Sequence, residues 1–225
     1  MMTTVQVHCP KCGQGLTARH VDAVAYGTPD FQKLLAGTLN CCKCPSCGTV
    51  LHVSGQLIYR ESDPPFILVQ HEMPVDGDTE AIEKDVDVIV TTVAADHNQP
   101  RPVVRLVFCR EDFLEKIFLH RDGHDDRMIE YVKYQLFQGG TDKLLSRRKY
   151  RLLYDFSAHD VDDLVFAVFD RETMKPVNCL KVPRLEYSRQ CEEFDLNPDL
   201  QKQLDMLFPN CVVSVDRLFE QAKEE

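Results

Sequence analysis

The chain has 225 residues, of which 44% are hydrophobic and 28% charged, and its formal net charge is −10 at pH 7. This composition is that of a globular protein, with enough residues for one domain or two small ones. The negative charge disfavours general binding to nucleic-acid backbones, and no apolar run approaches the ~18 residues that a membrane span needs. Residues 1–6 carry no basic region and no apolar signal core, so we expect a cytoplasmic protein.

The first part of the chain is β-prone and contains two turns of the sequence Cys-Pro-x-Cys-Gly, at residues 9–13 and 44–48. Each turn lies between β-prone segments, which predicts two hairpins and hence a zinc ribbon. Thr28, Pro29 and Gly37 have the spacing of an N-cap, a first-turn proline and a C-terminal glycine, which predicts a short inserted helix. The predicted strands of this part are 4–8, 16–25, 38–43, 50–53, 57–59 and 66–69.

The rest of the chain alternates between helical periodicity and β-prone runs, and it ends in a predicted antiparallel meander and an amphipathic helix. The fold class is therefore α+β. We divide the chain into a domain at 1–140 and a C-terminal region at 141–225, which can pack together as one unit. Helices are expected from 78 to about 94 and at 111–119, 125–138 and 198–207. Strands are expected at 103–109, 150–156, 164–170 and 177–182. Residues 211–225 are expected to form a strand followed by a helix.

Cys9, Cys12, Cys44 and Cys47 have the spacing of a structural zinc site, because two residues between two cysteines let one tight turn present both sulfurs to one ion. Proline within each turn fixes φ, and glycine after it allows the positive φ with which the chain leaves. We expect these four thiolates to hold one zinc ion. The alternative is a redox dithiol, which requires helix-forming residues directly after the second cysteine, where glycine and β-prone residues stand instead.

Other residues near the turns leave the identity of the metal ligands open. Cys41 and Cys42 lie directly upstream of Cys44 and can serve as spare ligands or strand residues, and His8 and His52 can replace a cysteine ligand. Elsewhere, Cys109, Cys179, Cys191 and Cys211 are scattered, and we expect them to be buried small apolar residues.

The two cysteine turns and the segment between them resemble the CpXC domain of bacteria and archaea. The segment residues that carry the resemblance are Pro29, Asp30, Leu34, Leu35, Gly37, Leu39 and Asn40, and later pieces at 57–59, 114–117 and 126–130 are also similar. The resemblance covers roughly residues 5–140. It implies a metal-binding domain and supplies no catalytic mechanism.

The best candidate for catalysis is residues 120–127, where His120, His124 and Asp125 lie within a run of two histidines and three aspartates. Such groups can share a proton near neutral pH or bind a second metal ion. The simpler interpretation is a loop between two helices, with an aspartate near the next helix N-terminus. The sequence has no glycine-rich phosphate loop, no Gly-x-Ser-x-Gly and no His-Glu-x-x-His, and four thiolates leave zinc no open position.

We therefore expect a non-enzymatic protein with one structural zinc ion that acts by binding another macromolecule. Protein is the expected partner, and the negative charge favours a basic or neutral one. A metal- or thiol-dependent enzyme or redox protein is the alternative, and binding of nucleic acid through the ribbon is a third hypothesis.

Overall fold

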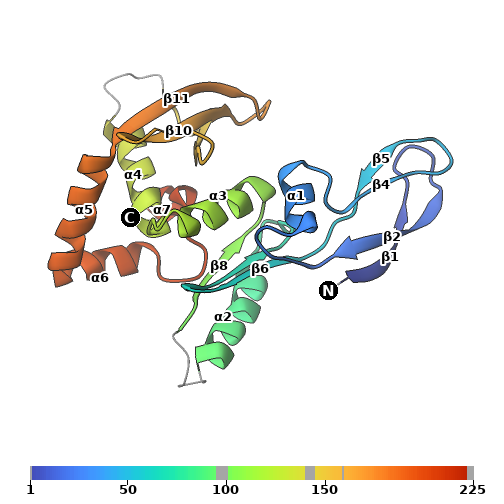
Figure 1. Ribbon diagram of the computed structural model, residues 1–225, viewed down its shortest axis with the longest axis horizontal. Coiled ribbons are helices and arrows are strands. Elements are labelled where there is room, and N and C mark those ends of the chain that lie inside the picture. Colours follow the sequence, from blue (N-terminus) through green and yellow to red (C-terminus); the bar gives the residue numbers. More distant parts are fainter. Residues whose placement is uncertain (1, 95–100, 140–144, 159, 222–225) are drawn as a thin grey trace. The chain divides into compact units, whose positions relative to one another are not determined.

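The computed structural model describes residues 2–94, 101–139, 145–158 and 160–221. The chain is a mixed α+β protein that divides into two compact units, Met1–Phe113 and Leu114–Glu225 (Figure 1). The division falls within helix α3 (Arg110–Arg121), so most of this helix and all of the next belong to the second unit. Within the described ranges, no helix combines the length and apolar character needed to span a bilayer.

The first unit contains both cysteine turns, each at the tip of a small antiparallel hairpin. Strands β1 (Met2–His8) and β2 (Gly15–Val21) form one hairpin, and β4 (Cys41–Lys43) and β5 (Val50–His52) form the other. Each hairpin is a separate two-stranded sheet. The predicted strand at 16–25 is wrong as one element, because the chain leaves the first hairpin at Val21 and its next residues, β3 (Ala23–Val24), join another sheet. The predicted strand at 38–43 is shorter, since only β4 pairs.

A four-stranded sheet forms the body of the first unit, with the strand order β3-β6-β7-β8. Strands β6 (Leu57–Ser62) and β7 (Pro65–Gln70) are antiparallel, and β7 is parallel to β8 (Val103–Val107). Parallel neighbours need a crossover, and helix α2 (Glu80–Ala94) lies between β7 and β8 in the chain.

The inserted helix α1 (Pro29–Leu35) confirms the sequence prediction. The Thr28 hydroxyl accepts a hydrogen bond from the Phe31 amide at 3.2 Å, Pro29 is in the first turn, and Gly37 has a φ of 76°. Phe31 and Leu34 are buried. The ring of Phe31 lies 5.2 Å from that of Tyr26 and 6.2 Å from that of Tyr59 on β6, so aromatic packing anchors the helix.

Asn40 connects the two hairpins. It adopts a left-handed conformation with φ 55°, which asparagine tolerates better than most residues. Its side-chain oxygen accepts a hydrogen bond from the Val21 amide at 2.7 Å, and its side-chain nitrogen donates to the Val21 carbonyl at 3.0 Å. One side chain thus pairs with the backbone of β2 as a neighbouring strand would.

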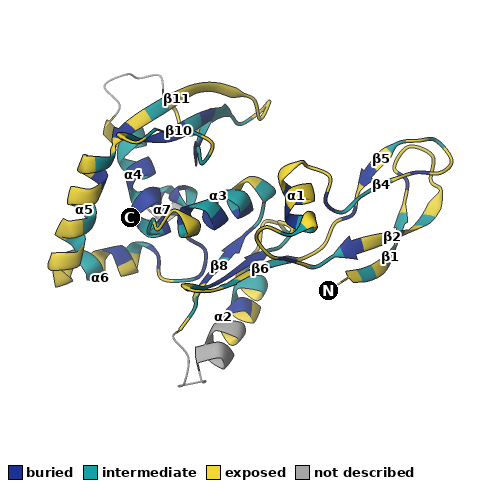
Figure 2. Ribbon diagram, in the orientation of Figure 1, coloured by how far each residue is buried: buried dark blue, intermediate teal, exposed yellow. Residues whose placement is uncertain are grey.

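The second unit packs helices around an antiparallel meander with the strand order β11-β10-β9. Helix α4 (Asp126–Gly139) contributes Met128, Ile129 and Val132 to its core. Figure 2 shows buried positions along α3 and α4, while β11 is largely exposed. The other elements are β9 (Tyr150–Tyr154), β10 (Asp163–Asp170), β11 (Pro176–Pro183), α5 (Arg184–Leu196), α6 (Pro198–Leu207) and α7 (Val215–Gln221).

Two elements of this unit differ from the sequence prediction. Helix α5 was not predicted, because its sequence is charged, Tyr187 is its only fully buried residue, and its apolar residues form no clear stripe. Residues 211–214 form no strand, and the chain passes directly into α7. Helix α6 confirms its prediction, since the Asn197 side chain accepts hydrogen bonds from the amides of Asp199 and Leu200.

A buried ionic network joins α3 to α4 inside the second unit. Lys133 Nζ lies 2.8 Å from Glu115 Oε2 and 2.9 Å from Glu130 Oε1, and Lys116 Nζ lies 2.9 Å from Asp126 Oδ2 and 3.3 Å from Glu130 Oε1. All five residues are at most 9% exposed. Burial alone would lower the pKa of Lys133, but the carboxylates of Glu115 and Glu130 raise it.

The network also binds two backbone amides from distant parts of the chain. The Tyr154 amide donates to Glu115 Oε1, and the Val215 amide at the start of α7 donates to Glu130 Oε2 at 2.8 Å. The carboxylates therefore fix β9 and α7 against the α3–α4 pair. A buried carboxylate requires such partners, because an unpaired one is costly.

We expect Lys133→Met to reduce the free energy of unfolding of the chain by about 3–5 kcal/mol, because it removes a buried cation that pairs with two buried carboxylates. Urea denaturation followed by circular dichroism measures the change. Lys202→Met is the control, since Lys202 is exposed and its pair with Asp199 spans 3.9 Å. Equal stability of the two variants would contradict the importance of the network.

Candidate metal centre

The two cysteine turns have the same backbone geometry. In the first, the Cys9 amide donates to the Gln14 carbonyl at 2.9 Å and the Gly13 amide to the Cys9 carbonyl at 2.8 Å. In the second, the Cys44 amide donates to Thr49 at 2.8 Å and the Gly48 amide to Cys44 at 2.9 Å. Both glycines have a φ of 73°, a conformation that glycine adopts without strain.

The four sulfurs of these turns converge. Sγ of Cys9 lies 3.5 Å from that of Cys47, Sγ of Cys12 lies 3.7 Å from that of Cys44, and all four atoms lie within 4.8 Å of one another. Four sulfurs at about 2.3 Å from a tetrahedral ion would be about 3.8 Å apart. The cluster therefore could hold one metal ion with four thiolate ligands.

The cluster is buried on one side only. Cys9 and Cys44 are 2% and 1% exposed, and they form a small core with Leu51, against which Leu16, Cys42 and Cys47 pack. This apolar core is much smaller than that of an independent domain. The two hairpin tips therefore depend on what holds the sulfurs together.

The sulfurs differ in their affinity for protons. Hydrogen bonding to the Thr49 side chain and backbone lowers the pKa of Cys47 to about 6. A backbone hydrogen bond at Gln14 lowers the pKa of Cys12, but burial and the other three sulfurs outweigh it and raise the pKa to about 11. Four neighbouring thiols cannot all ionise unless a cation compensates their charges, so proton loss and metal binding are coupled.

The spare ligands considered from the sequence do not join this cluster. Among the residues that the structure describes, the group able to hold a metal ion consists of the four turn cysteines alone. Cys41 Sγ instead donates to the Gly37 carbonyl at 3.5 Å, and Cys42 packs beside the cluster. His8 and His52 are exposed strand residues.

Of the four scattered cysteines, Cys211 is buried, but Cys179 is exposed on β11, so the expectation of burial is wrong for Cys179.

The candidate catalytic segment forms a helix connection, with Asp125 at the start of α4. The Asp125 carboxylate accepts hydrogen bonds from the Arg127 backbone amide at 2.9 Å and from the Arg127 guanidinium at 2.7 Å. His120 lies on α3 and is not brought together with His124 and Asp125 as a metal site. The segment is a connection between two helices with an aspartate at the start of the second, which is the simpler of the two interpretations of its sequence.

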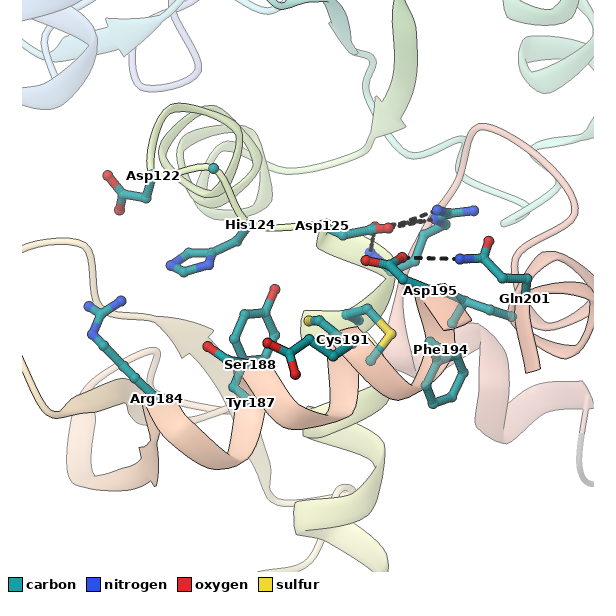
Figure 3. A pocket seen from close by; sticks show the side chains of 15 residues that line it. Asp122, His124, Asp125, Arg184, Tyr187, Ser188, Cys191, Phe194, Asp195 and Gln201 are labelled. Carbon is teal, nitrogen blue, oxygen red and sulfur yellow. Dashed lines mark hydrogen bonds and ion pairs between the residues drawn. The ribbon is translucent and has the colours of Figure 1, made fainter. Parts of the chain in front are cut away.

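His124 and Asp125 nevertheless line a cavity of about 460 Å³, where they face Tyr187 and Cys191 of α5 (Figure 3). His124 Nε2 is buried and has no hydrogen-bond partner within the described part of the chain. Its ring packs edge-on against Tyr154 and Tyr187 at 5.6 and 5.3 Å. Burial raises the pKa of Cys191, so the thiol is not activated as a nucleophile. The sequence predicts Cys191 only as a buried apolar residue and does not single out Tyr187, because α5 is not evident in the sequence.

The fold and the cysteine cluster define a mixed α+β protein with a four-cysteine site able to bind a metal ion. The family model described as CpXC protein matches residues 7–133, which is more than half of the chain. The chain therefore belongs to the CpXC family, as the resemblance in its sequence predicted. A search of curated proteins finds no match, and a search of solved structures finds none either.

The family match ends within α4 and so includes part of the second unit. It contains every charged side chain of the buried network, from Glu115 to Lys133. The backbone amides that complete this network, at Tyr154 and Val215, lie beyond the match.

Removing a bound ion with a chelator should expose the hairpin tips to solvent, because the metal–sulfur bonds are lost and only a very small core remains. We expect faster hydrogen–deuterium exchange at the amides of Cys9, Gly13, Cys44 and Gly48. The amides of β6 and β7 should stay protected, since their sheet has its own core. Unchanged exchange at the four turn amides would contradict a structural ion.

His124 should make the stability of the chain sensitive to acid. Burial, and then the charge of Arg184, lowers the pKa of His124, so the unfolded state binds a proton at higher pH than the folded state. The stability from this group is present above the unfolded pKa of about 6.5 and is lost as the pH falls towards the folded pKa.

The measurement is the free energy of unfolding by urea at about pH 7 and pH 5. We expect it to fall less between these values for His124→Gln than for the unmodified chain. His71→Gln, at a partly exposed position in the other unit, is the control. Identical pH dependence of His124→Gln and the unmodified chain would rule out this role of His124.

Proposed function

We propose that this chain is a zinc-ribbon protein in which Cys9, Cys12, Cys44 and Cys47 hold one structural Zn²⁺, and that it acts as a protein-interaction module in the cytoplasm. The observation that carries the proposal is the convergence of four sulfurs from two equivalent turns. Tetrahedral thiolate sets favour zinc or iron–sulfur centres, and two Cys-x-x-Cys turns are typical of structural zinc.

A structural role for the ion follows from its ligand set. Four thiolates fill the tetrahedral coordination of zinc, so no position remains for water or substrate. The ion would stabilise the hairpins, and apparent binding free energies of such sites are ~10–16 kcal/mol, which is comparable to the stability of a whole domain. Folding of the hairpins and zinc binding would thus be one event.

The net charge of the chain supports binding of protein over binding of nucleic acid, because a charge of −10 opposes the phosphate backbone. All ten cysteines are free thiols, which suits a reducing compartment such as the cytoplasm.

Metal content and thiol reactivity test the zinc site against a redox dithiol. We expect one zinc ion per purified chain and slow alkylation of Cys47 until a chelator is added. Cys47 is informative because hydrogen bonding to Thr49 lowers its pKa, which favours the reactive thiolate once the ion is removed. Exposed Cys179 is the internal control and should react with or without chelator. Rapid alkylation of Cys47 in the untreated protein, or absence of zinc, would contradict the proposal.

Capture from an extract of the native cell, after nuclease treatment, tests the interaction role. We expect a reproducible protein partner that the unmodified chain and Cys179→Ser retain and that Cys44→Ser loses, because only the latter removes a cluster sulfur. Retention by Cys44→Ser would separate partner binding from the ribbon. Loss of the captured material after nuclease treatment would favour nucleic acid.

A further inference from the structure

Arg110 is a half-buried cation without a counter-ion. It is the first residue of α3, and its guanidinium reaches the end of α1, where a Cβ built on Gly37 would lie 3.7 Å from Arg110 Nη1. Within the described part of the chain, it forms neither an ion pair nor a hydrogen bond. Glu111 and the Cys41 thiol influence it electrostatically, but neither pairs with it. Other partly buried arginines, such as Arg127 and Arg171, each have an aspartate partner.

The Arg110 guanidinium lines a small cavity, which we call the Arg110 notch. The notch has a volume of about 40 Å³ and lies within the first unit. Its polar lining consists of Asn40, His52, Gln70 and Arg110, and its apolar lining of Leu34, Leu39, Val53 and Leu57, with Gly55. No carboxylate belongs to this lining.

The notch is rich in hydrogen-bond donors. Both ends of the Asn40 amide already pair with Val21, so this side chain has little capacity left. The guanidinium offers several N–H groups, the Gln70 amide offers two, and the His52 ring can offer one. These donors converge from β7, β5 and the start of α3.

A partly buried guanidinium without a partner is unfavourable, and burial lowers its pKa. A bound anion would remove this cost. A cavity needs roughly 10–15 Å³ on this measure to hold one water molecule, so the notch has room for a small group such as two oxygens on one carbon. The planar fork of arginine binds such a group through two parallel hydrogen bonds.

We propose that the Arg110 notch binds a carboxylate group, with the Arg110 guanidinium as its main ligand and the Gln70 amide as a second donor. The carboxylate belongs either to a side chain or C-terminus of a partner protein or to a small free acid. A carboxylate from a partner protein rests on the proposed interaction function. Binding of a carboxylate in the notch does not depend on that function. A basic or neutral partner can still present one carboxylate here, since the notch is a local exception to the negative charge of the chain.

Nuclear magnetic resonance titration of the full chain with sodium acetate tests the notch, with sodium chloride at equal ionic strength as the control salt. We expect saturable shifts of the Val53 and Gly55 amides with acetate and only small linear shifts with chloride. Arg110→Gln should weaken acetate binding at least tenfold. Lys33→Gln should leave it unchanged, because Lys33 is an exposed cation of the same unit that pairs with Asp30. Equal shifts with both salts, or unchanged binding by Arg110→Gln, would overturn the proposal.

A second variant keeps the test decisive if Arg110→Gln folds poorly. Gln70→Glu places a carboxylate in the notch itself, so we expect it to pair with Arg110, to raise the melting temperature and to abolish acetate binding. Acetate binding by Gln70→Glu with the affinity of the unmodified chain would also overturn the proposal.

Two further probes separate the possible sources of the carboxylate. A blocked pentapeptide, acetyl-Gly-Gly-Glu-Gly-Gly-amide, is compared with the same peptide carrying Gln in place of Glu. Tighter binding of the Glu peptide than of acetate assigns the notch to a partner protein, and equal affinities assign it to small free acids. Acetate binding that persists when no protein is captured from cell extract would leave the notch established and the interaction function contradicted.

Discussion

A charge taken out of water must be compensated by an opposite charge, and this constraint governs the structure at three places. Four cysteine sulfurs converge at the hairpin tips, where their thiolates require a cation. Two buried lysines meet three buried carboxylates between α3 and α4. At the Arg110 notch, a half-buried guanidinium has no counter-charge among the described residues, and we infer an external one.

The two units compensate their buried charges in different ways. The hairpins of the first unit bury little apolar surface, and the buried cluster at their tips consists of Cys9, Cys44 and Leu51. Ligation by a metal ion can replace the missing core. The second unit has a large apolar core in addition to its ionic network. The network also specifies positions, because Glu115 and Glu130 bind the amides of Tyr154 and Val215.

The groups considered for catalysis around the start of α4 have structural roles in this molecule. The helix start at Asp125 is satisfied by Arg127, and the Cys191 thiol in the adjacent cavity has a raised pKa. A four-thiolate ion offers no open coordination site. The four-cysteine cluster and the Arg110 notch both lie in the first unit.

The sequence by itself determined the features that depend on local chemistry. The spacing of cysteine, proline and glycine defines both turns, and Thr28, Pro29, Gly37, Asn197 and Pro198 mark helix ends through their own backbone preferences. The family resemblance rests mainly on the two cysteine turns and the segment between them, and the match over residues 7–133 confirms it.

Only the tertiary structure decided which distant residues meet. Lys133 and Glu115 are 18 positions apart, and nothing in either helix sequence indicates that these charged residues turn inward. Helix α5 has no clear apolar stripe, so it becomes recognisable only through the core that Tyr187 enters. The Arg110 notch brings together residues 40, 52, 70 and 110, which share no sequence pattern. Local preference acts over a few residues, whereas burial and charge compensation depend on the whole folded chain.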